Sequence, residues 1–220
     1  MSSRIILPLD NTPWEDARRI MQRTRGLVWG YKLRRSILER GLGAVAEVRQ
    51  YGKVMLDFKL YDIPSAMTES LILHITAGAD ITTVHCTAGY DPRAAGMPAD
   101  HIAGVTILTS TAERDFRRFY RGRTISEMVE QMARQAQDRY EYLVCSPKEL
   151  KQIGPVQIKK ICPGVRPSWY TAGDDQTRTA TPADAMRDGA DLLVIGRPLL
   201  KAADMLEALE RTNAEIEAAR

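Results

Sequence analysis

Cysteine and histidine are scarce in this chain of 220 residues, which holds three of each. The cysteines Cys86, Cys145 and Cys162 lie far apart and are odd in number, so neither a disulfide framework nor a Cys-x-x-Cys metal site is expected. The histidines show no His-Glu-x-x-His spacing, and no histidine-based zinc site is predicted. We expect the cysteines to be buried as small apolar side chains near strand ends.

Long apolar runs are absent as well. The longest unbroken apolar stretches span about five residues, as in residues 5–9. A membrane-spanning helix needs about 20 apolar residues, and the core of a signal peptide about 7–15, so neither is predicted. Asp10, Glu15 and Asp16 argue against an organelle transit peptide, which is normally poor in acidic residues. The sequence therefore predicts a soluble, cytoplasmic protein.

The net charge is small. The 31 basic and 28 acidic side chains leave +3, too little to indicate a nucleic-acid or membrane partner. One segment, residues 114–123, is an exception, because it interleaves arginines with aromatic residues in a way that suits nucleic-acid binding. Glu113 and Asp115 dilute its charge, so we expect a solvated helix or loop there and no nucleic-acid partner.

Short β-rich runs alternate with longer helical stretches along the whole chain. Such alternation predicts parallel strands joined by helices. Eight repeats in a chain this short favour a closed (β/α)₈ barrel, the α/β architecture called a TIM barrel, with one domain over residues 1–220. The runs are residues 4–9, 27–33, 53–60, 81–86, 101–109, 141–145, 156–162 and 191–196.

Helix start signals lie between these runs. Thr12 is placed as a capping residue with Pro13 at the first helical position. Residues 126–137 and 182–188 have similar signals. Apolar residues three or four apart predict one amphipathic closing helix; these are Leu199, Ala203, Leu206 and Leu209.

Charged residues follow the first three apolar runs. Asp10 ends the first, Lys32 the second, and Asp57 and Lys59 the third, with Asp62 three residues further on. Reactive residues of these barrels stand at the carboxyl ends of the strands, where we expect these charges of both signs to meet. Asp57 and Lys59 are two apart on a strand and therefore share a face. A surface salt-bridge network explains any one of them, but the set favours a catalytic cluster.

A second candidate site lies late in the sequence. The loop after the seventh run, up to Thr181, is about 18 residues long, and loops above about 12–15 residues are uncommon unless they are functional. Gln176 and Arg178 lie in this loop, and Gly196 and Arg197 follow the eighth run, just before a new helix. Loops after strands 7 and 8 form the usual phosphate site of this fold. The residues alone thus predict an enzyme that acts on a phosphorylated small molecule through a Lys/Asp cluster.

Residues 57–64, with the sequence Asp-Phe-Lys-Leu-Tyr-Asp-Ile-Pro, resemble the hallmark of the orotidine 5′-monophosphate (OMP) decarboxylase family. The resemblance covers nearly the whole chain. Further matching motifs, in the family's order, are Leu9-Asp10, Lys32, Val84-His85, residues 108–111, residues 144–146, residues 162–166, Asp175-Gln176-x-Arg178 and Gly196-Arg197. The resemblance implies conversion of OMP to uridine 5′-monophosphate (UMP), the last step of de novo pyrimidine nucleotide synthesis, without metal or organic cofactor.

The family also implies specific roles. Lys32, Asp57, Lys59 and Asp62 match its catalytic charge array, and Asp62, with Ile63, would reach the neighbouring active site of a homodimer. Among the residues that match substrate ligands, Asp10 would bind a ribose hydroxyl, Ser110 or Thr111 would face the pyrimidine, Pro163 would pack near the base, and Gln176 and Arg197 would bind the phosphate.

Three positions depart from the family pattern. Arg34 stands where glycine is common, Ala66 where threonine is usual, and Pro198 where serine is common. The first two leave open the packing behind Lys32 and one contact across the dimer. None removes a member of the charge array.

The main alternative is a magnesium-dependent sugar-phosphate decarboxylase or lyase of the same barrel superfamily, such as 3-keto-L-gulonate 6-phosphate decarboxylase or hexulose-phosphate synthase. Those enzymes share Asp-x-Lys-x-x-Asp but use an acidic residue after strand 2 to bind the metal. This chain has Lys32 there, which is a poor metal ligand, and Ile-Pro follows its second Asp. Tryptophan and histidine biosynthetic barrels share the phosphate site but lack the motif.

Overall fold

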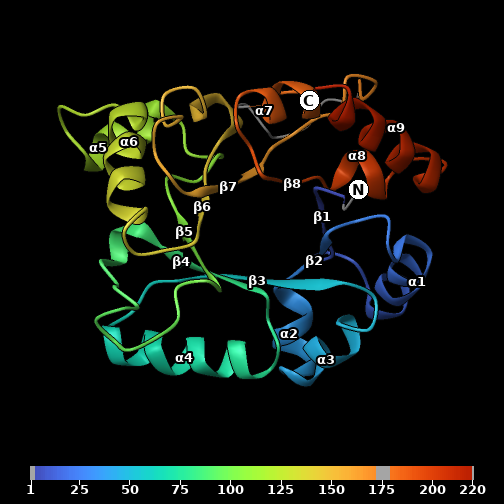
Figure 1. The fold of residues 1–220 in the computed structure, drawn as a ribbon, viewed down its shortest axis with the longest axis horizontal. Coiled ribbons are helices and arrows are strands. Elements are labelled where there is room, and N and C mark those ends of the chain that lie inside the picture. Colours follow the sequence, from blue (N-terminus) through green and yellow to red (C-terminus); the bar gives the residue numbers. More distant parts are fainter. Residues whose placement is uncertain (1–2, 172–178, 220) are drawn as a thin grey trace.

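Eight parallel strands form a closed barrel in the computed structural model, which describes residues 3–171 and 179–219 (Figure 1). Each strand pairs with the next, and β8 pairs with β1 in the register Ile5 to Leu193. The expected (β/α)₈ architecture is confirmed. The strands are β1 (Ile5–Pro8), β2 (Gly30–Leu33), β3 (Lys53–Leu60), β4 (Ile81–His85), β5 (Ile102–Val105), β6 (Tyr142–Val144), β7 (Lys159–Pro163) and β8 (Leu192–Val194).

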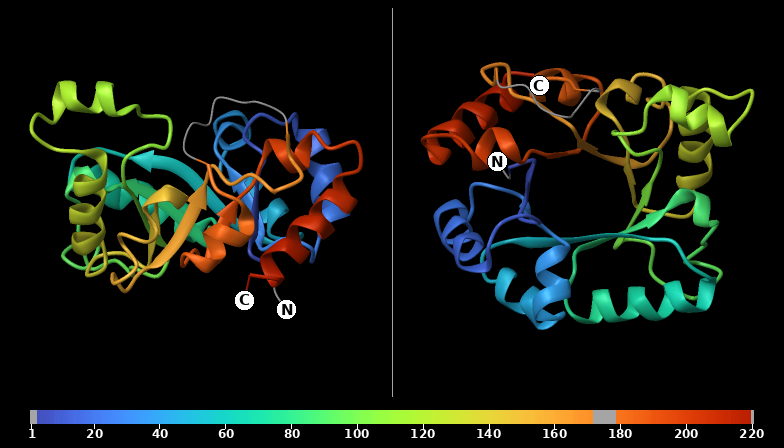
Figure 2. Two further views of the ribbon diagram at one scale, coloured as in Figure 1. Left: turned by 90° about the horizontal axis from the view of Figure 1, so that it is seen from above. Right: turned by 180° about the vertical axis from the view of Figure 1, so that it is seen from behind.

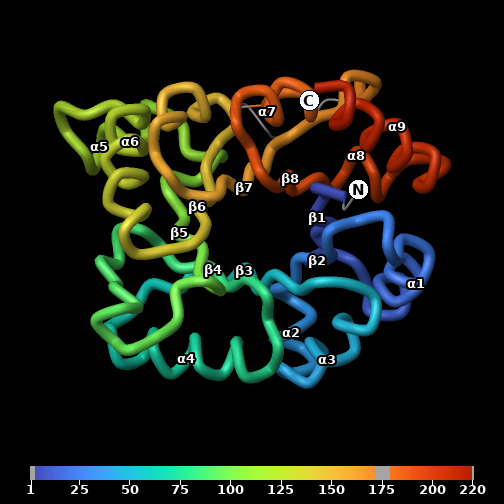
Figure 3. Tube along the Cα trace, in the orientation of Figure 1, coloured from blue at the N-terminus to red at the C-terminus, as the bar shows by residue number. Residues whose placement is uncertain are grey.

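Helices surround the barrel, and the tube in Figure 3 follows the chain as it passes from strand to helix around the ring. The left view of Figure 2 shows α5 (green) set apart from this ring, above α6. The helices are α1 (Trp14–Thr24), α2 (Arg35–Arg40), α3 (Gly43–Val48), α4 (Pro64–Thr76), α5 (Glu113–Phe119), α6 (Ile125–Ala136), α7 (Pro182–Arg187), α8 (Arg197–Leu200) and α9 (Met205–Glu217), with short 3₁₀ turns η1 (Cys86–Ala88) and η2 (Pro147–Glu149).

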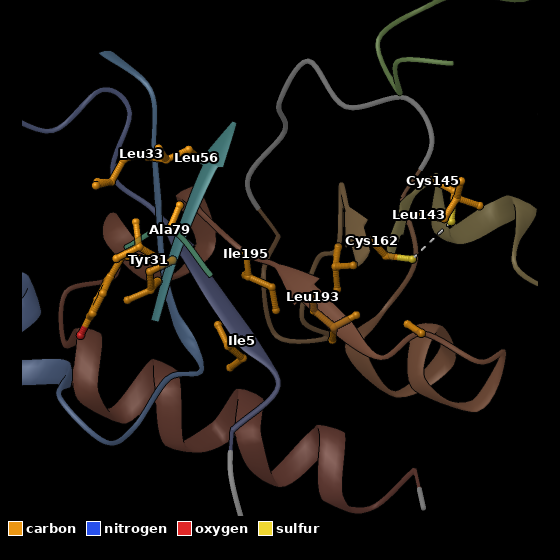
Figure 4. Packing of buried hydrophobic residues seen from close by; sticks show 14 of the residues in the cluster. Ile5, Tyr31, Leu33, Leu56, Ala79, Leu143, Cys145, Cys162, Leu193 and Ile195 are labelled. Carbon is orange, nitrogen blue, oxygen red and sulfur yellow. Dashed lines mark hydrogen bonds between the residues drawn. The ribbon is translucent and has the colours of Figure 1, made fainter. Parts of the chain in front are cut away.

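Alternate residues of each strand divide the core into two layers. Ile6 packs with side chains of other strands inside the barrel, whereas Ile5 and Leu7 belong to the larger cluster between strands and helices, part of which Figure 4 shows. The close approach of β2 and β3 requires a glycine, because a Cβ on Gly30 would lie 2.2 Å from the carbonyl oxygen of Lys53.

The structure corrects several expected boundaries. Strand β5 ends at Val105, so residues 106–109 lie in the loop that follows it. Helix α1 begins at Trp14, with Pro13 as its N-cap and no side-chain cap, so Thr12 is not the capping residue. The expected single closing helix is instead α8 and α9. Asp204 accepts from the backbone N–H groups of Leu206 and Glu207 and thereby starts a new helix.

The arginine-rich segment is a surface helix, as expected. Within α5, Arg117 pairs with Glu113, and both Arg114 and Arg118 pair with Asp115. No helix in the described part of the chain is long and apolar enough to cross a membrane. Cys145 and Cys162 are buried on neighbouring strand ends with their sulfurs 4.0 Å apart (Figure 4).

Candidate active site

The charged residues that follow β1, β2 and β3 meet at the carboxyl end of the barrel. Lys32, Asp57 and Lys59 line a cavity of about 330 Å³, and Asp10 contacts Lys32 at its edge. Parallel strands bring their carboxyl ends to one rim, which is why residues far apart in sequence converge here. The cavity is lined by Lys32, Arg34, Met55, Asp57, Lys59, Val105, Ile107, Leu108, Thr109, Ser110, Val144, Cys145, Pro163 and Val194.

One carboxylate oxygen joins the two lysines. Oδ2 of Asp57 lies 2.9 Å from Nζ of Lys32 and 2.8 Å from Nζ of Lys59. Lys32 also forms an ion pair with Oδ2 of Asp10. The result is a chain of alternating charges, Asp10–Lys32–Asp57–Lys59, in which each charge is held in place by its neighbours.

Burial and charge act in opposite directions on this array. Burial alone would raise the pKa of Asp57, but the ammonium groups of Lys32 and Lys59 and their hydrogen bonds lower it to about 2. Burial alone would lower the pKa of Lys32, yet Asp57 and Asp10 raise it above its ordinary value. At neutral pH Asp57 is therefore a fixed anion and Lys32 a fixed cation.

The backbone around Lys59 is irregular. Lys59 has φ +52°, and the pairing of β3 with β4 shifts register between Leu56 and Leu60. The hydroxyl of Thr83 on β4 accepts a hydrogen bond from the Lys59 backbone N–H at 2.8 Å and donates one to Oδ1 of Asp57 at 3.1 Å. Thr83 thus forms hydrogen bonds with both Lys59 and Asp57. Sequence reasoning did not single out this threonine, whose only signal is its place in a strand beside the motif.

Apolar side chains form the wall of the cavity opposite the charges. Val105, Ile107, Leu108 and Val144 come from β5, β6 and the loop after β5. Ser110 lines this cavity, whereas the neighbouring Thr111 lines a separate depression under α5. Of the two residues that the sequence left open, Ser110 is the one at the cavity.

A second, more polar groove of about 630 Å³ adjoins the cavity, and Lys32, Pro163 and Val194 line both. Its other walls include Asp10, Gly196 and the cations Arg166, Arg197 and Lys201. Arg166 lies in the matched motif of residues 162–166 but was given no role there, and Lys201 is a groove cation that the sequence patterns did not indicate. The site therefore joins a small cavity with paired charges to a cationic groove.

Gly196 lies between β8 and α8, where the close approach of Pro8 leaves no room for a side chain. A Cβ at this position would lie 2.9 Å from Cγ of Pro8, which is tighter than side chains tolerate. Arg197 begins α8, so the helix expected just after Gly196 and Arg197 is present, and it is four residues long.

A family model describes this chain over almost its full length. The model of the orotidine 5′-phosphate decarboxylase / HUMPS family matches residues 3–212. The chain belongs to this family.

Curated relatives within the family align with this chain over nearly the whole of both chains. An orotidine 5′-phosphate decarboxylase of Caulobacter vibrioides is 35% identical, over 97% of each chain. One of Paramagnetospirillum magneticum is 34% identical, over 98% of this chain and 99% of the relative. The crystal structure of orotidine 5′-phosphate decarboxylase from Lactobacillus acidophilus matches with a TM-score of 0.79 at 25% identity, covering 97% of this chain and 99% of that one.

Some residues that match the family's motifs do not lie in the cavity. Asp62 and Ile63 are exposed beyond the end of β3, and Oδ1 of Asp62 accepts from the Ile63 backbone N–H at 2.7 Å. Neither residue lines the cavity of its own chain. Gln176 and Arg178 lie outside the described residues.

Residues 3–171 and 179–219 contain no group of three or more His, Cys, Asp or Glu side chains that could hold a metal ion. The position after β2, where the sugar-phosphate alternative needs an acidic ligand, is Lys32, whose ammonium group pairs with Asp10 and Asp57.

Proposed function

We propose that this chain converts OMP to UMP and carbon dioxide without a metal or organic cofactor. The observation that carries the proposal is the array in which Asp57 pairs with both Lys32 and Lys59 at the wall of a cavity beside a cationic groove. The relatives named as orotidine 5′-phosphate decarboxylases support the same substrate.

The chemical difficulty of this reaction is the electron pair left on the ring. When the bond between C6 and the carboxylate breaks, carbon dioxide leaves and C6 keeps both electrons, with no π system to take them. The barrier is very high, and the reduction required lies towards the upper end of about 8–23 kcal/mol. A fixed cation at C6 is the most direct way to lower it.

Lys59 is the residue proposed for that position. Its ammonium group stabilises the developing carbanion and then donates a proton to C6, and solvent restores the proton to the amine. Lys32 holds Asp57 from the other side, so the array keeps its geometry while Lys59 changes charge.

Asp57 contributes through repulsion. Its pKa of about 2 keeps it ionised, and we place the substrate carboxylate next to it. Two like charges about 4 Å apart cost about 4 kcal/mol at an effective dielectric near 20. This repulsion is relieved as carbon dioxide leaves, so it lowers the barrier from the substrate side.

The remaining candidates bind the nucleotide. Oδ1 of Asp10 is buried and has no hydrogen-bond partner in the described part of the chain, which suits a ribose hydroxyl. Ser110 faces the cavity for the pyrimidine edge, and Pro163 lines both cavity and groove, where a base meets its ribose phosphate. The phosphate ligands in this proposal are Gln176, Arg178, Gly196 and Arg197, and binding energy from this distant group holds the ring in position.

We also propose a homodimer with shared active sites. Asp62 lies outside its own cavity, and it stands between Tyr61 and Ile63, each of which is 64% exposed. Large apolar side chains exposed next to a site favour an interface. In a two-fold dimer each Asp62 would enter the other chain's cavity, and each dimer would hold two composite sites. We place the enzyme in the cytoplasm, because a charged nucleotide does not cross a bilayer unaided.

Turnover of OMP tests the proposal directly. Purified protein in metal-free buffer should deplete OMP, as followed by the ultraviolet absorbance of the orotate ring, and should yield UMP. Absence of OMP turnover, together with magnesium-dependent turnover of a 3-keto sugar-acid phosphate or a hexulose phosphate, would establish the alternative.

A further inference from the structure

Arg34 lines the catalytic cavity at a family position where glycine is common. It directly follows β2, and its backbone carbonyl accepts hydrogen bonds from the N–H groups of Ile37 and Leu38, at 3.1 and 3.3 Å. These bonds fix the main chain at the start of α2. Arg34 is an exposed residue at the cavity wall, and no carboxylate among the described residues forms an ion pair with it.

The next residue provides a contrast. Arg35 has the same side chain and is exposed in the first turn of α2, but its Nε pairs with Oε1 of Glu39 at 2.7 Å. Arg35 does not line the cavity. Of these two adjacent arginines, Arg35 pairs with a carboxylate of its own helix, whereas Arg34 lines the cavity.

The charge balance of the cavity depends on Arg34. The two lysines are matched by two carboxylates, because Asp57 binds both Lys32 and Lys59 and Asp10 binds Lys32. Arg34 is the remaining charged side chain that lines the cavity, so the described residues of one chain, without Asp62 of a second copy, give the site one positive charge in excess. A site of this kind accepts one anion at low electrostatic cost.

OMP carries two anionic groups, and the structure offers them different cations. The groove that suits the phosphate contains Arg166, Arg197 and Lys201 but not Arg34. The cavity that suits the ring contains Arg34. The planar guanidinium presents paired donors that match a carboxylate in geometry as well as in charge.

We propose that Arg34 is a specificity-determining residue that binds the ring carboxylate of the substrate and so distinguishes OMP from UMP, which lacks that group. The inference rests on the proposed function. Arg34 would stabilise the bound substrate rather than the transition state, because the carboxylate is lost as carbon dioxide forms. Arg34 therefore offsets part of the repulsion between Asp57 and the substrate carboxylate during binding. The product UMP has no anion on its ring, so Arg34 does not hold it.

Binding of OMP and UMP to matched variants tests this. In a Lys59→Ala background, which prevents turnover, calorimetric titration measures both dissociation constants with and without Arg34→Ala. Loss of a charge-assisted pair should weaken OMP binding about tenfold, whereas UMP binding should change less than about twofold. In otherwise wild-type enzyme, Arg34→Ala should raise KM for OMP and leave the inhibition constant of UMP unchanged.

Two further variants serve as controls. Arg35→Ala removes an equivalent charge one residue away and should leave both nucleotides unaffected. Arg34→Lys keeps the charge without the paired donors and should recover part of the OMP affinity. Equal weakening of OMP and UMP, or no change in either, would overturn the inference.

An alternative partner for Arg34 is Asp62 of a second copy. In that case Arg34→Ala would promote dissociation of the dimer on dilution, as measured by analytical ultracentrifugation, and would leave the ratio of OMP to UMP affinity unchanged, which also overturns the inference. The proposed function is tested separately, since wild-type turnover of OMP does not depend on the outcome for Arg34.

Discussion

Lys59 pairs with Asp57 while its backbone has a positive φ, a conformation that residues other than glycine rarely adopt. Its φ is +52°, and its ammonium group lies 2.8 Å from Oδ2 of Asp57. A left-handed residue costs about 1–2 kcal/mol, so other contacts must hold it. Thr83 supplies two of these contacts, one to the backbone of Lys59 and one to the carboxylate of Asp57.

Thr83→Val should lower kcat about tenfold with little change in KM, because it leaves the Lys59 N–H without its acceptor and Oδ1 of Asp57 without the Thr83 donor. Steady-state kinetics on OMP measures this effect. Thr83→Ser keeps the hydroxyl and should retain most of the activity. Equal loss of activity in both variants would contradict a positioning role for the hydroxyl.

Lys59→Ala should abolish turnover and leave a folded protein, since the side chain lies at the cavity wall and is partly exposed. Circular dichroism checks the fold and the absorbance assay checks the turnover. Lys53→Ala is the matched control, because Lys53 is exposed at the other end of β3 and stacks on Trp29. Substantial activity in folded Lys59→Ala, without added amine, would rule out Lys59 as the proton donor.

Activity should persist in excess EDTA. The proposed reaction uses ammonium and carboxylate groups alone, and Lys32 occupies the position where the sugar-phosphate alternative needs a metal-binding carboxylate. The rate of OMP consumption before and after chelation is the measurement. Loss of activity that magnesium restores would favour the alternative.

Mixing two inactive variants should restore activity if the sites are shared. Lys59→Ala and Asp62→Ala homodimers should each be nearly inactive. Random subunit exchange gives about half heterodimers, each with one intact and one doubly altered site, so activity should recover to about a quarter of wild type. If mass spectrometry shows exchange but activity stays absent, Asp62 serves its own barrel.

Acid should remove the stability that the Asp57 ion pairs provide. The pKa of Asp57 in the folded protein is about 2, below the ordinary 3.8, so its contribution is full above pH 4 and is lost as the pH falls towards 2. A difference of this size corresponds to about 2 kcal/mol. Urea unfolding between pH 4 and 2 should therefore show a steeper loss of stability in wild type than in Asp57→Asn. Parallel curves for the two proteins would show that Asp57 does not carry this dependence.

The sequence by itself determined the barrel and the position of its reactive end. Alternating strand and helix patterns allow few other arrangements, and charges after apolar runs must lie at the rim where parallel strands end. Asp10, Lys32, Asp57 and Lys59 were therefore predictable as one cluster. The capping signals were less decisive, since Asp204 divides the closing helix at a point that the apolar spacing did not indicate.

Only the tertiary structure decided how these groups are connected. Thr83 reaches Lys59 and Asp57 because β4 lies beside β3 with an irregular register, and no pattern within β4 reveals this. Spatial contact likewise separates Ser110 from Thr111 and gives Arg34 and Arg35 different surroundings. Sequence periodicity specifies which face a residue occupies, but pairing between charges depends on distances across strands that only the folded barrel sets.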